Sequence, residues 1–287
     1  MTLEASRIEK IIEFAESKNF PDSTPYSSIS VEHIKSLSKR YECSGREIEI
    51  EALKNEVIPE RYARNFKTFT ARDQIALLDA SVTVVGLGGL GGAVVEILAR
   101  IGIGSLNLID GDSFEDSNLN RQFLCTADAL STAKAMAAAQ RVNAINRSID
   151  VTHHHLFMDE QNSARLLKNS DLAVDCLDNL KTRFIVENAC KNHKIPMVSA
   201  AVAGTTGHLT TIFPEDRGLR LIYGEPDRAP LKGAETLLGT IPYAVTFMAT
   251  LECAEVIKII QKKGSLLRNK LLIADLNDTS IEVLQLI

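Results

Sequence analysis

The sequence predicts an α/β fold with a Rossmann-like, mostly parallel sheet, helices on both faces of the sheet, and an extension of antiparallel strands. From Ser81, short β-rich runs alternate with helical stretches, which is typical of parallel strands joined by helical crossovers. After Ala200 the strand-like runs follow one another without that helical rhythm, so we expect antiparallel pairing there. The first 58 residues have a different texture and are predicted to form a helical N-terminal extension.

In the extension, apolar residues recur at helical spacing from Ile8 to Ala15 and indicate an amphipathic helix. The stretch from Asn19 to Ser30 contains two prolines among Ser, Asp and Thr residues, and it is predicted to be turn-forming. Two further helices are expected at Val31–Tyr41 and at about Ser44–Asn55. These two helices could form a helix-turn-helix, but the acidity of the segment favours packing or contact with a protein partner over contact with DNA.

Residues 59–287 are predicted to form the main domain, with a parallel part over about 81–200 and an antiparallel part over about 201–287. In the parallel part we expect strands at Val82–Val85, Leu106–Ile109, Asp150–His154, Leu172–Asp175 and Pro196–Ala200, and helices at about Leu90–Ile101, Ser131–Asn146, Glu160–Lys168 and Lys181–Lys194. In the antiparallel part we expect strands at Leu209–Phe213, Leu271–Ala274 and Ile281–Leu286. The helix Tyr243–Lys262 is apolar on almost every side, which predicts burial in a core or in a subunit interface.

Composition excludes several classes of protein. The net charge of −5, with 5% aromatic residues and no Trp, argues against a broad nucleic-acid surface and against a base-stacking surface. No apolar run is long enough for a membrane span. Five cysteines without a CxxC pair exclude a disulfide framework and a paired-CxxC zinc site. With no secretory signal at the N-terminus, these features predict a cytoplasmic protein.

A glycine-rich turn is the strongest local motif. Gly86, Gly88 and Gly91 fit the pattern G-x-G-x-x-G between a strand and a helix, where backbone amides can approach phosphate closely. Asp110 closes the next strand, at the place where an acidic residue binds a ribose hydroxyl in dinucleotide enzymes. These features predict nucleotide binding, and by themselves they would favour NAD.

The residues after Asp110 argue against NAD, because a nicotinamide needs a flat and mostly apolar slot. Asn118, Arg121 and Gln122 instead place amide and cationic groups beyond the end of a strand. Lys134 lies near the start of a helix that Ser131 could cap, where the helix dipole disfavours a cation. A nearby anion such as a phosphate chain would relieve that conflict, and an exposed, solvated lysine is the alternative.

Two carboxylates follow another predicted strand, in the string Asp175-Cys176-Leu177-Asp178-Asn179. Mg²⁺ usually takes one or two carboxylates together with phosphate oxygens, so this string predicts a magnesium ligand. The alternative is an aspartate that caps the helix beginning near Lys181, and only one of the pair need be a ligand.

These motifs occur together in the order of one known family. The segment Arg61-Tyr62-Ala63-Arg64 comes first, followed by the glycine turn, the D-x-D…S-N-L-x-R-Q string from Asp110, Lys134 and D-C-x-D-N. From about Pro59 to the C-terminus the chain resembles the MoeB/ThiF/HesA family, the bacterial relatives of the ubiquitin-activating enzymes.

The resemblance implies an ATP-dependent adenylyltransferase. Gly88 and Gly89 would approach the phosphates, Asp110 would hold the ribose, and Asp178 would bind Mg²⁺. Arg64 would enter the site of the partner in a homodimer and act like an arginine finger supplied in trans. The other implied site residues are Gly86, Gly91, Asp112, Asn118, Arg121, Gln122, Lys134 and Asn179.

The implied reaction joins the C-terminal glycine carboxylate of a small ubiquitin-like sulfur carrier with a Gly-Gly tail to AMP, in molybdopterin, tungstopterin or thiamine synthesis. A terminal carboxylate has a pKa of about 3.5, so at neutral pH it is already the nucleophile and needs no general base. The site must instead position the reactants, neutralise phosphate charge and support the leaving pyrophosphate.

Three departures from the family pattern change what is expected. The two CxxC pairs that hold zinc in many relatives are absent, so we predict no zinc. The stretch from Glu215 to Pro242 has no cysteine, so covalent transfer through that loop is not expected. Ser131 stands where the family has glycine, which puts the start of the following helix in question. Among the cysteines, Cys125 is the one to test for reactivity, and the others favour core positions.

Three alternatives stay open at this point. A related enzyme could activate a carboxylate on modified transfer RNA, which would need a basic RNA-facing surface. The chain could be an inactive scaffold, although the joint presence of Arg64, Arg121, Lys134 and Asp178 argues against that. An NAD-dependent oxidoreductase is the least favoured.

Overall fold

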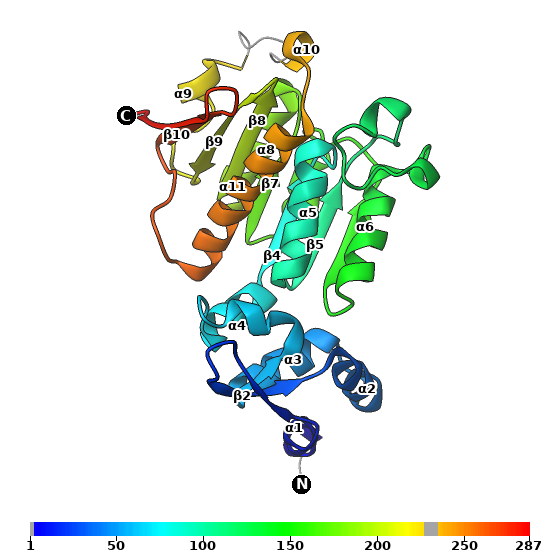
Figure 1. Cartoon of the computed structure of the whole chain (residues 1–287). Coiled ribbons are helices and arrows are strands. Elements are labelled where there is room, and N and C mark those ends of the chain that lie inside the picture. Colours follow the sequence, from blue (N-terminus) through cyan, green and yellow to red (C-terminus); the bar gives the residue numbers. More distant parts are fainter. Residues whose placement is uncertain (1–2, 227–234) are drawn as a thin grey trace.

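The computed structural model describes residues 3–226 and 235–287 and shows two units (Figure 1). The larger unit is built on an eight-stranded sheet in the order β11-β10-β9-β8-β7-β4-β5-β6. Five strands run parallel, namely β4 (Ser81–Val85), β5 (Ser105–Ile109), β6 (Asp150–His154), β7 (Leu172–Asp175) and β8 (Met197–Ala203). The antiparallel strands are β9 (Thr206–Ile212), β10 (Lys270–Asp275) and β11 (Ser280–Gln285). The predicted fold class is therefore confirmed.

Helices cover both faces of this sheet (Figure 1). On one face, α5 (Gly89–Ile101), α6 (Lys134–Ile145) and α11 (Pro242–Gln261) pack on an apolar core that includes Val84, Leu108 and Val198. On the other face, α7 (Ser163–Leu167) and α8 (Leu180–His193) bury Val85, Ile109 and Met197. The two sets match the alternation of side chains along each strand. Short helices connect the strands: η1 (Glu60–Asn65), α4 (Ala71–Asp79), η2 (Asp116–Asn118), η3 (Ala127–Ala129), α9 (Arg220–Tyr223) and α10 (Glu235–Leu238).

The strand order creates a crevice near the centre of the sheet, where the carboxyl ends of β4 and β7 lie next to each other. After β6 the chain returns to the opposite side of β4 and enters β7, so the direction of strand addition reverses between these two neighbours. Val85 at the end of β4 pairs with Asp175 at the end of β7. Ligands of open α/β sheets bind in the crevice beyond such a reversal. The glycine turn and the D-C-x-D-N string therefore emerge side by side.

The N-terminal extension corrects the prediction of a purely helical unit. Besides α1 (Leu3–Glu13), α2 (Val31–Tyr41) and α3 (Gly45–Lys54), it contains a three-stranded sheet of β1 (Glu16–Asn19), β2 (Pro25–Ile29) and β3 (Val57–Pro59). The expected turn region is mostly a hairpin in which β1 pairs with β2, and β3 adds in parallel. The sequence of β1 is polar throughout, so tertiary pairing and not strand propensity determines its conformation.

The apolar helix near the C-terminus lies in the core, which is one of the two locations expected for it, the other being a subunit interface. Residues of α11 such as Val245, Met248 and Cys253 are buried against α5 and strands β8 and β9. Tyr243 at its first turn is half exposed. Among the helices that the structure describes, none is long and apolar enough to cross a membrane. The boundaries predicted at residues 58 and 200 remain predictions.

The helix that carries Lys134 begins later than expected, and Ser131 does not cap it. α6 starts at Lys134, its N-cap is Ala133, and no side chain accepts a hydrogen bond at that cap. Ser131 instead has φ of 66°, in the left-handed region that favours glycine. The glycine that the resemblance implies at this position thus has a conformational reason.

Ser131→Gly is therefore expected to stabilise the protein by about 1 kcal/mol, because the left-handed conformation strains a residue that has a Cβ atom. The side chain of Ser131 is exposed, so its loss exposes no core. Urea unfolding should show a higher midpoint with an unchanged slope. Ser131→Ala is the matched control, since it removes the hydroxyl but keeps the Cβ atom. Equal midpoints for all three proteins would contradict the assignment of strain.

Candidate active site

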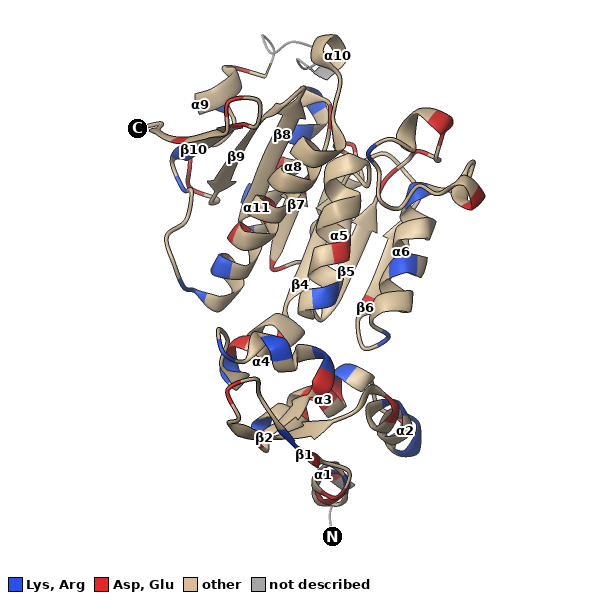
Figure 2. Ribbon diagram, in the orientation of Figure 1, with Lys and Arg blue, Asp and Glu red and all other residues tan. Residues whose placement is uncertain are grey.

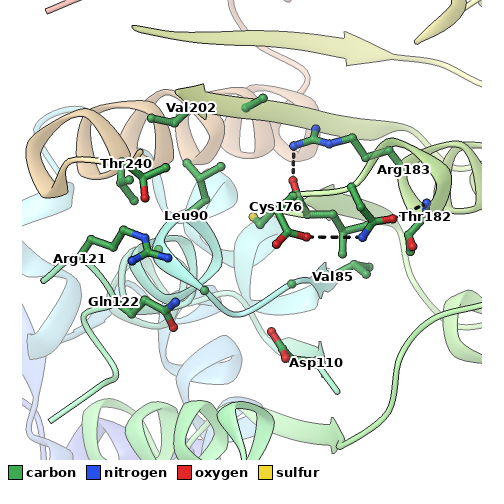
Figure 3. Close-up of a pocket in the computed structure, with 18 of the residues that line it drawn as sticks. Val85, Leu90, Asp110, Arg121, Gln122, Cys176, Thr182, Arg183, Val202 and Thr240 are labelled. Atoms are coloured by element: carbon green, nitrogen blue, oxygen red, sulfur yellow. Dashed lines mark hydrogen bonds between the residues drawn. The ribbon is translucent and has the colours of Figure 1, made fainter. Parts of the chain in front are cut away.

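A cavity of 1320 Å³ opens at the carboxyl ends of β4, β5 and β7 and extends along β8, β9 and β10 (Figure 3). It brings together most of the site residues predicted from the sequence. Those that line it are Gly86, Gly88, Gly89, Asp110, Asp112, Asn118, Arg121, Gln122, Lys134, Asp178 and Asn179. Gly91 and Arg64 do not line it.

The glycine turn is fixed by close backbone contacts. Gly86 has φ of 88°, and a Cβ atom there would lie 2.7 Å from the carbonyl oxygen of Cys176. A Cβ atom on Gly91 would lie 1.8 Å from the carbonyl oxygen of Gly86. Gly91 therefore makes the turn possible without facing the cavity. At Gly88 a Cβ atom would meet only the side chain of Gln122, at 3.6 Å, so the backbone there is open to a ligand.

Asp110 braces the glycine turn. Its Oδ2 accepts a hydrogen bond from the backbone N–H of Leu87 at 2.6 Å, and its Oδ1 accepts one from Asp112 N at 2.7 Å. Burial raises the pKa of the Asp110 carboxyl, and the two backbone hydrogen bonds oppose that effect. The carboxylate therefore has a structural task beside the ribose contact predicted for it.

Lys134 is buried, so the alternative of an exposed, solvated lysine is wrong. It is the first residue of α6, where the positive end of the helix dipole opposes a cation. Its Nζ lies 3.2 Å from Oδ2 of Asp112, and this carboxylate supplies a neighbouring anion. Because Asp112 is more than half exposed, the pair faces the cavity and is open to further anions.

The Asn118-Arg121-Gln122 cluster combines a buried and an exposed part. Asn118 is buried and accepts a hydrogen bond from Glu115 N at 3.2 Å, which closes the short helix η2. Arg121 donates to the carbonyl oxygen of Ser117 and to Asn120. Oε1 of Gln122 is buried and has no hydrogen-bond partner among the residues that the structure describes. A buried oxygen that lacks a hydrogen-bond partner beside the glycine turn is available to accept a hydrogen bond from a ligand.

In the D-C-x-D-N string, the asparagine and not an aspartate caps the next helix. Asn179 accepts a hydrogen bond from Thr182 N at 2.9 Å, at the N-cap of α8. Asp175 is fully buried and forms an ion pair with Arg183 at 2.9 Å. Asp178 is exposed on the cavity wall. Of the two carboxylates, only that of Asp178 is therefore available to a metal.

Sequence reasoning missed a buried polar network beneath the string. Arg183 is buried and donates to Asp175, to Ser199 and to the carbonyl oxygens of Leu177 and Ala200, so it ties β7, α8 and β8 together. Burial also raises the pKa of the Cys176 thiol well above its ordinary value. A basic residue four positions after an N-cap asparagine is the sequence signal for this anchor.

A second missed pair lies farther along the cavity. Nε2 of His208 in β9 lies 2.7 Å from the hydroxyl of Tyr223 in α9. Burial, together with the positive charge of Arg183, lowers the pKa of His208 to about 4, so its imidazole is neutral at neutral pH. The cavity thus passes from cationic and amide groups at the glycine turn to a neutral, partly apolar arm along the antiparallel strands.

Comparison with known proteins agrees with this geometry. A model of the ThiF family matches residues 62–286. The chain belongs to the ThiF family. As the resemblance implied, it is an ATP-dependent adenylyltransferase, and the alternative of an NAD-dependent oxidoreductase is set aside. The chain is 32% identical to the SAMP-activating enzyme E1 of Haloferax volcanii, over 78% of this chain and 83% of that protein.

Two other curated relatives match this ThiF-family chain at a similar level of sequence identity. It is 34% identical to protein HesA of Trichormus variabilis, over 76% of this chain and 81% of that protein. It is also 34% identical to the adenylyltransferase and sulfurtransferase MOCS3 of Danio rerio, over 79% of this chain. That match spans only 50% of MOCS3, so the chain corresponds to about half of that relative.

Among solved structures, E. coli MccB with ATP has a TM-score of 0.69 at 21% identity, over 99% of this chain and 87% of MccB. PaaA has a TM-score of 0.65 at 22% identity, over 79% of this chain and 82% of PaaA. These likenesses concern the fold, and the MccB match includes the N-terminal unit.

Proposed function

We propose that the protein uses Mg-ATP to adenylate the C-terminal glycine carboxylate of a small ubiquitin-like sulfur carrier with a Gly-Gly tail, without a covalent cysteine intermediate. The observation that carries this proposal is the continuity of the cavity. It joins the glycine turn and Lys134 to Ala203, Thr206 and Ile273 on the antiparallel strands. An extended tail lying along those strands would bring its terminal carboxylate to the triphosphate. Molybdopterin, tungstopterin and thiamine synthesis are the pathways that we propose, in the cytoplasm.

The residues present fit Mg-ATP. The backbone at Gly88 is open to a phosphate, and the buried Oε1 of Gln122 can accept a donor of the nucleotide. No group of three His, Cys, Asp or Glu side chains that could hold a metal occurs among the described residues. Magnesium would instead combine the single carboxylate of Asp178 with phosphate oxygens, and it would neutralise charge on the leaving pyrophosphate. The predicted absence of zinc stays a prediction.

The reaction needs no general base, because the terminal carboxylate of the carrier is already ionised at neutral pH. A carboxylate oxygen of the carrier attacks the α-phosphorus, the bond from that phosphorus to the bridging oxygen breaks, and pyrophosphate leaves with the bonding electrons. Lys134 and Arg121 would hold the phosphate oxygens while negative charge shifts to the leaving group. Asn118 and Asp110 keep the surrounding turns in place through their backbone hydrogen bonds.

We further propose that the enzyme is a homodimer in which Arg64 of one subunit completes the site of the other. Arg64 lies in η1, is exposed, and does not line the cavity of its own chain. Its guanidinium forms no hydrogen bond or ion pair with any residue that the structure describes, so it is available to a phosphate of a neighbouring subunit.

Exchange of radiolabelled pyrophosphate into ATP tests the proposed substrate. Exchange that needs a folded Gly-Gly-tailed carrier supports the proposal. Exchange that depends on transfer RNA would contradict it and identify RNA as the substrate. In the ribbon of Figure 2, the positions of Lys and Arg are interspersed with those of Asp and Glu in both units, and with a net charge of −5 this distribution does not favour the RNA alternative. ATP binding without exchange for any acceptor would favour an inactive scaffold.

A second candidate substrate is a peptide without a folded carrier domain. MccB has been solved with MccA, and it matches 99% of this chain, including the extension. The three curated relatives compared above align over only 76–79% of the chain. Exchange that proceeds equally well with a short synthetic peptide and with a folded carrier of the same C-terminus would favour this candidate.

Cys125→Ser is expected to keep full exchange activity. Cys125 is buried, its thiol points to the carbonyl oxygen of Glu115 at 3.9 Å, and burial raises the pKa of the thiol, so little of it is the reactive thiolate. Exchange rates of the variant and of the wild type at equal carrier concentration check this. A loss of more than about tenfold without a loss of stability would revive a covalent mechanism.

A further inference from the structure

The turn that carries Arg64 is held by the N-terminal extension. η1 spans Glu60–Asn65 and follows β3 directly. Its apolar side is buried, with Tyr62 fully inaccessible, while Arg64 is exposed. A side chain that must reach a neighbouring subunit depends on the rigidity of the backbone beneath it, because its own rotamers are unconstrained.

The first anchor of this turn is Glu60. Its carboxylate accepts a hydrogen bond from the hydroxyl of Ser28 at 2.5 Å and one from the hydroxyl of Tyr26 at 3.3 Å. Lys18 lies 3.3 Å from the same carboxylate. Lys18 belongs to β1, and Tyr26 and Ser28 belong to β2, so one glutamate at the start of η1 is attached to both strands of the hairpin.

The second anchor is Glu49 of α3, which is fully buried. It forms an ion pair with Arg61 at 3.4 Å and accepts a hydrogen bond from the Tyr62 hydroxyl at 3.3 Å. Ser148 of the larger unit donates to the same carboxylate at 3.1 Å. The Tyr62 hydroxyl in turn accepts from Nδ2 of Asn146 at 2.9 Å.

These contacts place η1 between the two units. A Cβ atom on Gly45 at the start of α3 would lie 2.5 Å from Oγ of Ser148, and one on Gly102 would lie 2.6 Å from the Tyr62 hydroxyl. The extension therefore packs tightly on the larger unit at the start of α3, and η1 packs tightly on it at Tyr62. Removing either anchor would leave buried polar groups without partners or free one end of the turn.

We propose that the N-terminal extension is a positioning element for Arg64, with Glu60 and Glu49 as the positioning residues that fix its backbone toward the neighbouring subunit. The inference deepens the proposed function and relies on it for the role of Arg64. It assigns a task to residues 16–58 that is independent of any partner binding to the extension.

A double-mutant cycle tests the inference. Glu60→Ala is expected to lower carrier-dependent exchange about tenfold, while leaving the dissociation constant for Mg-ATP unchanged because Glu60 lies outside the cavity. In the Arg64→Ala background, Glu60→Ala should cost nothing further, since there is no longer an arginine to position. Hydrogen–deuterium exchange gives a readout that does not depend on activity, and residues 60–66 should take up deuterium faster in Glu60→Ala.

Glu51→Ala is the matched control. The substitution removes the ion pair with Arg7 inside the extension, and Glu51 contacts no residue of η1. Pyrophosphate exchange and the deuterium uptake of residues 60–66 should therefore stay at wild-type levels. An equal loss from Glu60→Ala with and without Arg64, or unchanged uptake at residues 60–66, would overturn the positioning role. Full activity of Arg64→Ala would overturn it as well. If the wild-type protein shows no carrier-dependent pyrophosphate exchange, the proposed function itself is contradicted.

Discussion

Asp178→Ala is expected to abolish carrier-dependent pyrophosphate exchange, by about a thousandfold or more, without a change in stability. Asp178 is the exposed carboxylate of the string on the cavity wall, and among the described residues its side chain accepts a hydrogen bond only from its neighbour Asn179, at 3.5 Å. Its removal therefore breaks nothing in the fold, while the proposed metal loses its protein ligand and the leaving pyrophosphate loses charge neutralisation. Initial exchange rates and thermal melting of the same preparations measure the two effects.

The matched control is Asp128→Ala, which removes an exposed aspartate outside the cavity and should leave exchange intact. Arg121→Ala should behave like Asp178→Ala, since among the residues that the structure describes Arg121 donates only to Ser117 and Asn120 on its own short loop. Full activity of either cavity variant would mean that the triphosphate lies elsewhere, because both residues were assigned to it by position.

The fold and the gathering of most predicted site residues around one cavity were predictable, because both follow from local sequence patterns and from the assembly of parallel strands. Strand runs such as Val82–Val85 are bounded by turns, and strands joined by helical crossovers run parallel, so their carboxyl ends meet at the same edge of the sheet. Residues that follow these strands, such as Asp110 and Asp178, therefore gather at one edge. The cavity lined by eleven of the thirteen predicted site residues is a consequence of that topology.

What the sequence did not predict depends on tertiary contacts. β1 is polar along its whole length, and only its pairing with β2 makes it a strand. Ser131 looked like a cap, but its backbone N–H donates to the carbonyl oxygen of Phe114, and the loop held in this way has Ser131 at positive φ. Arg183 and His208 carry no motif of their own, and their importance comes from burial beside Asp175 and Tyr223. Such residues are visible only once distant strands are side by side.

Mixing two variants that each lack one residue of the proposed site is expected to restore activity, if Arg64 acts across a dimer. Arg64→Ala leaves the cavity of its own chain complete, and Asp178→Ala leaves a complete Arg64, since Asp178 lines the cavity and Arg64 lies in η1 outside it. In a randomly reassociated equal mixture, half of the dimers are mixed, and each of these has one site with both residues intact. Exchange should therefore rise to about one quarter of the wild-type rate.

The choice of variants separates action in trans from action in cis. If Arg64 served its own chain, every site in the mixture would lack one of the two residues, and exchange would stay at the level of the separate variants. A mixture of Arg121→Ala with Asp178→Ala is the internal control: both residues line the same cavity, so the mixed dimer has no complete site and should remain inactive. Restoration in the first mixture but not in the second requires Arg64 to act on a cavity of another chain. Equal restoration in both would instead mean that the cavity itself is shared between subunits.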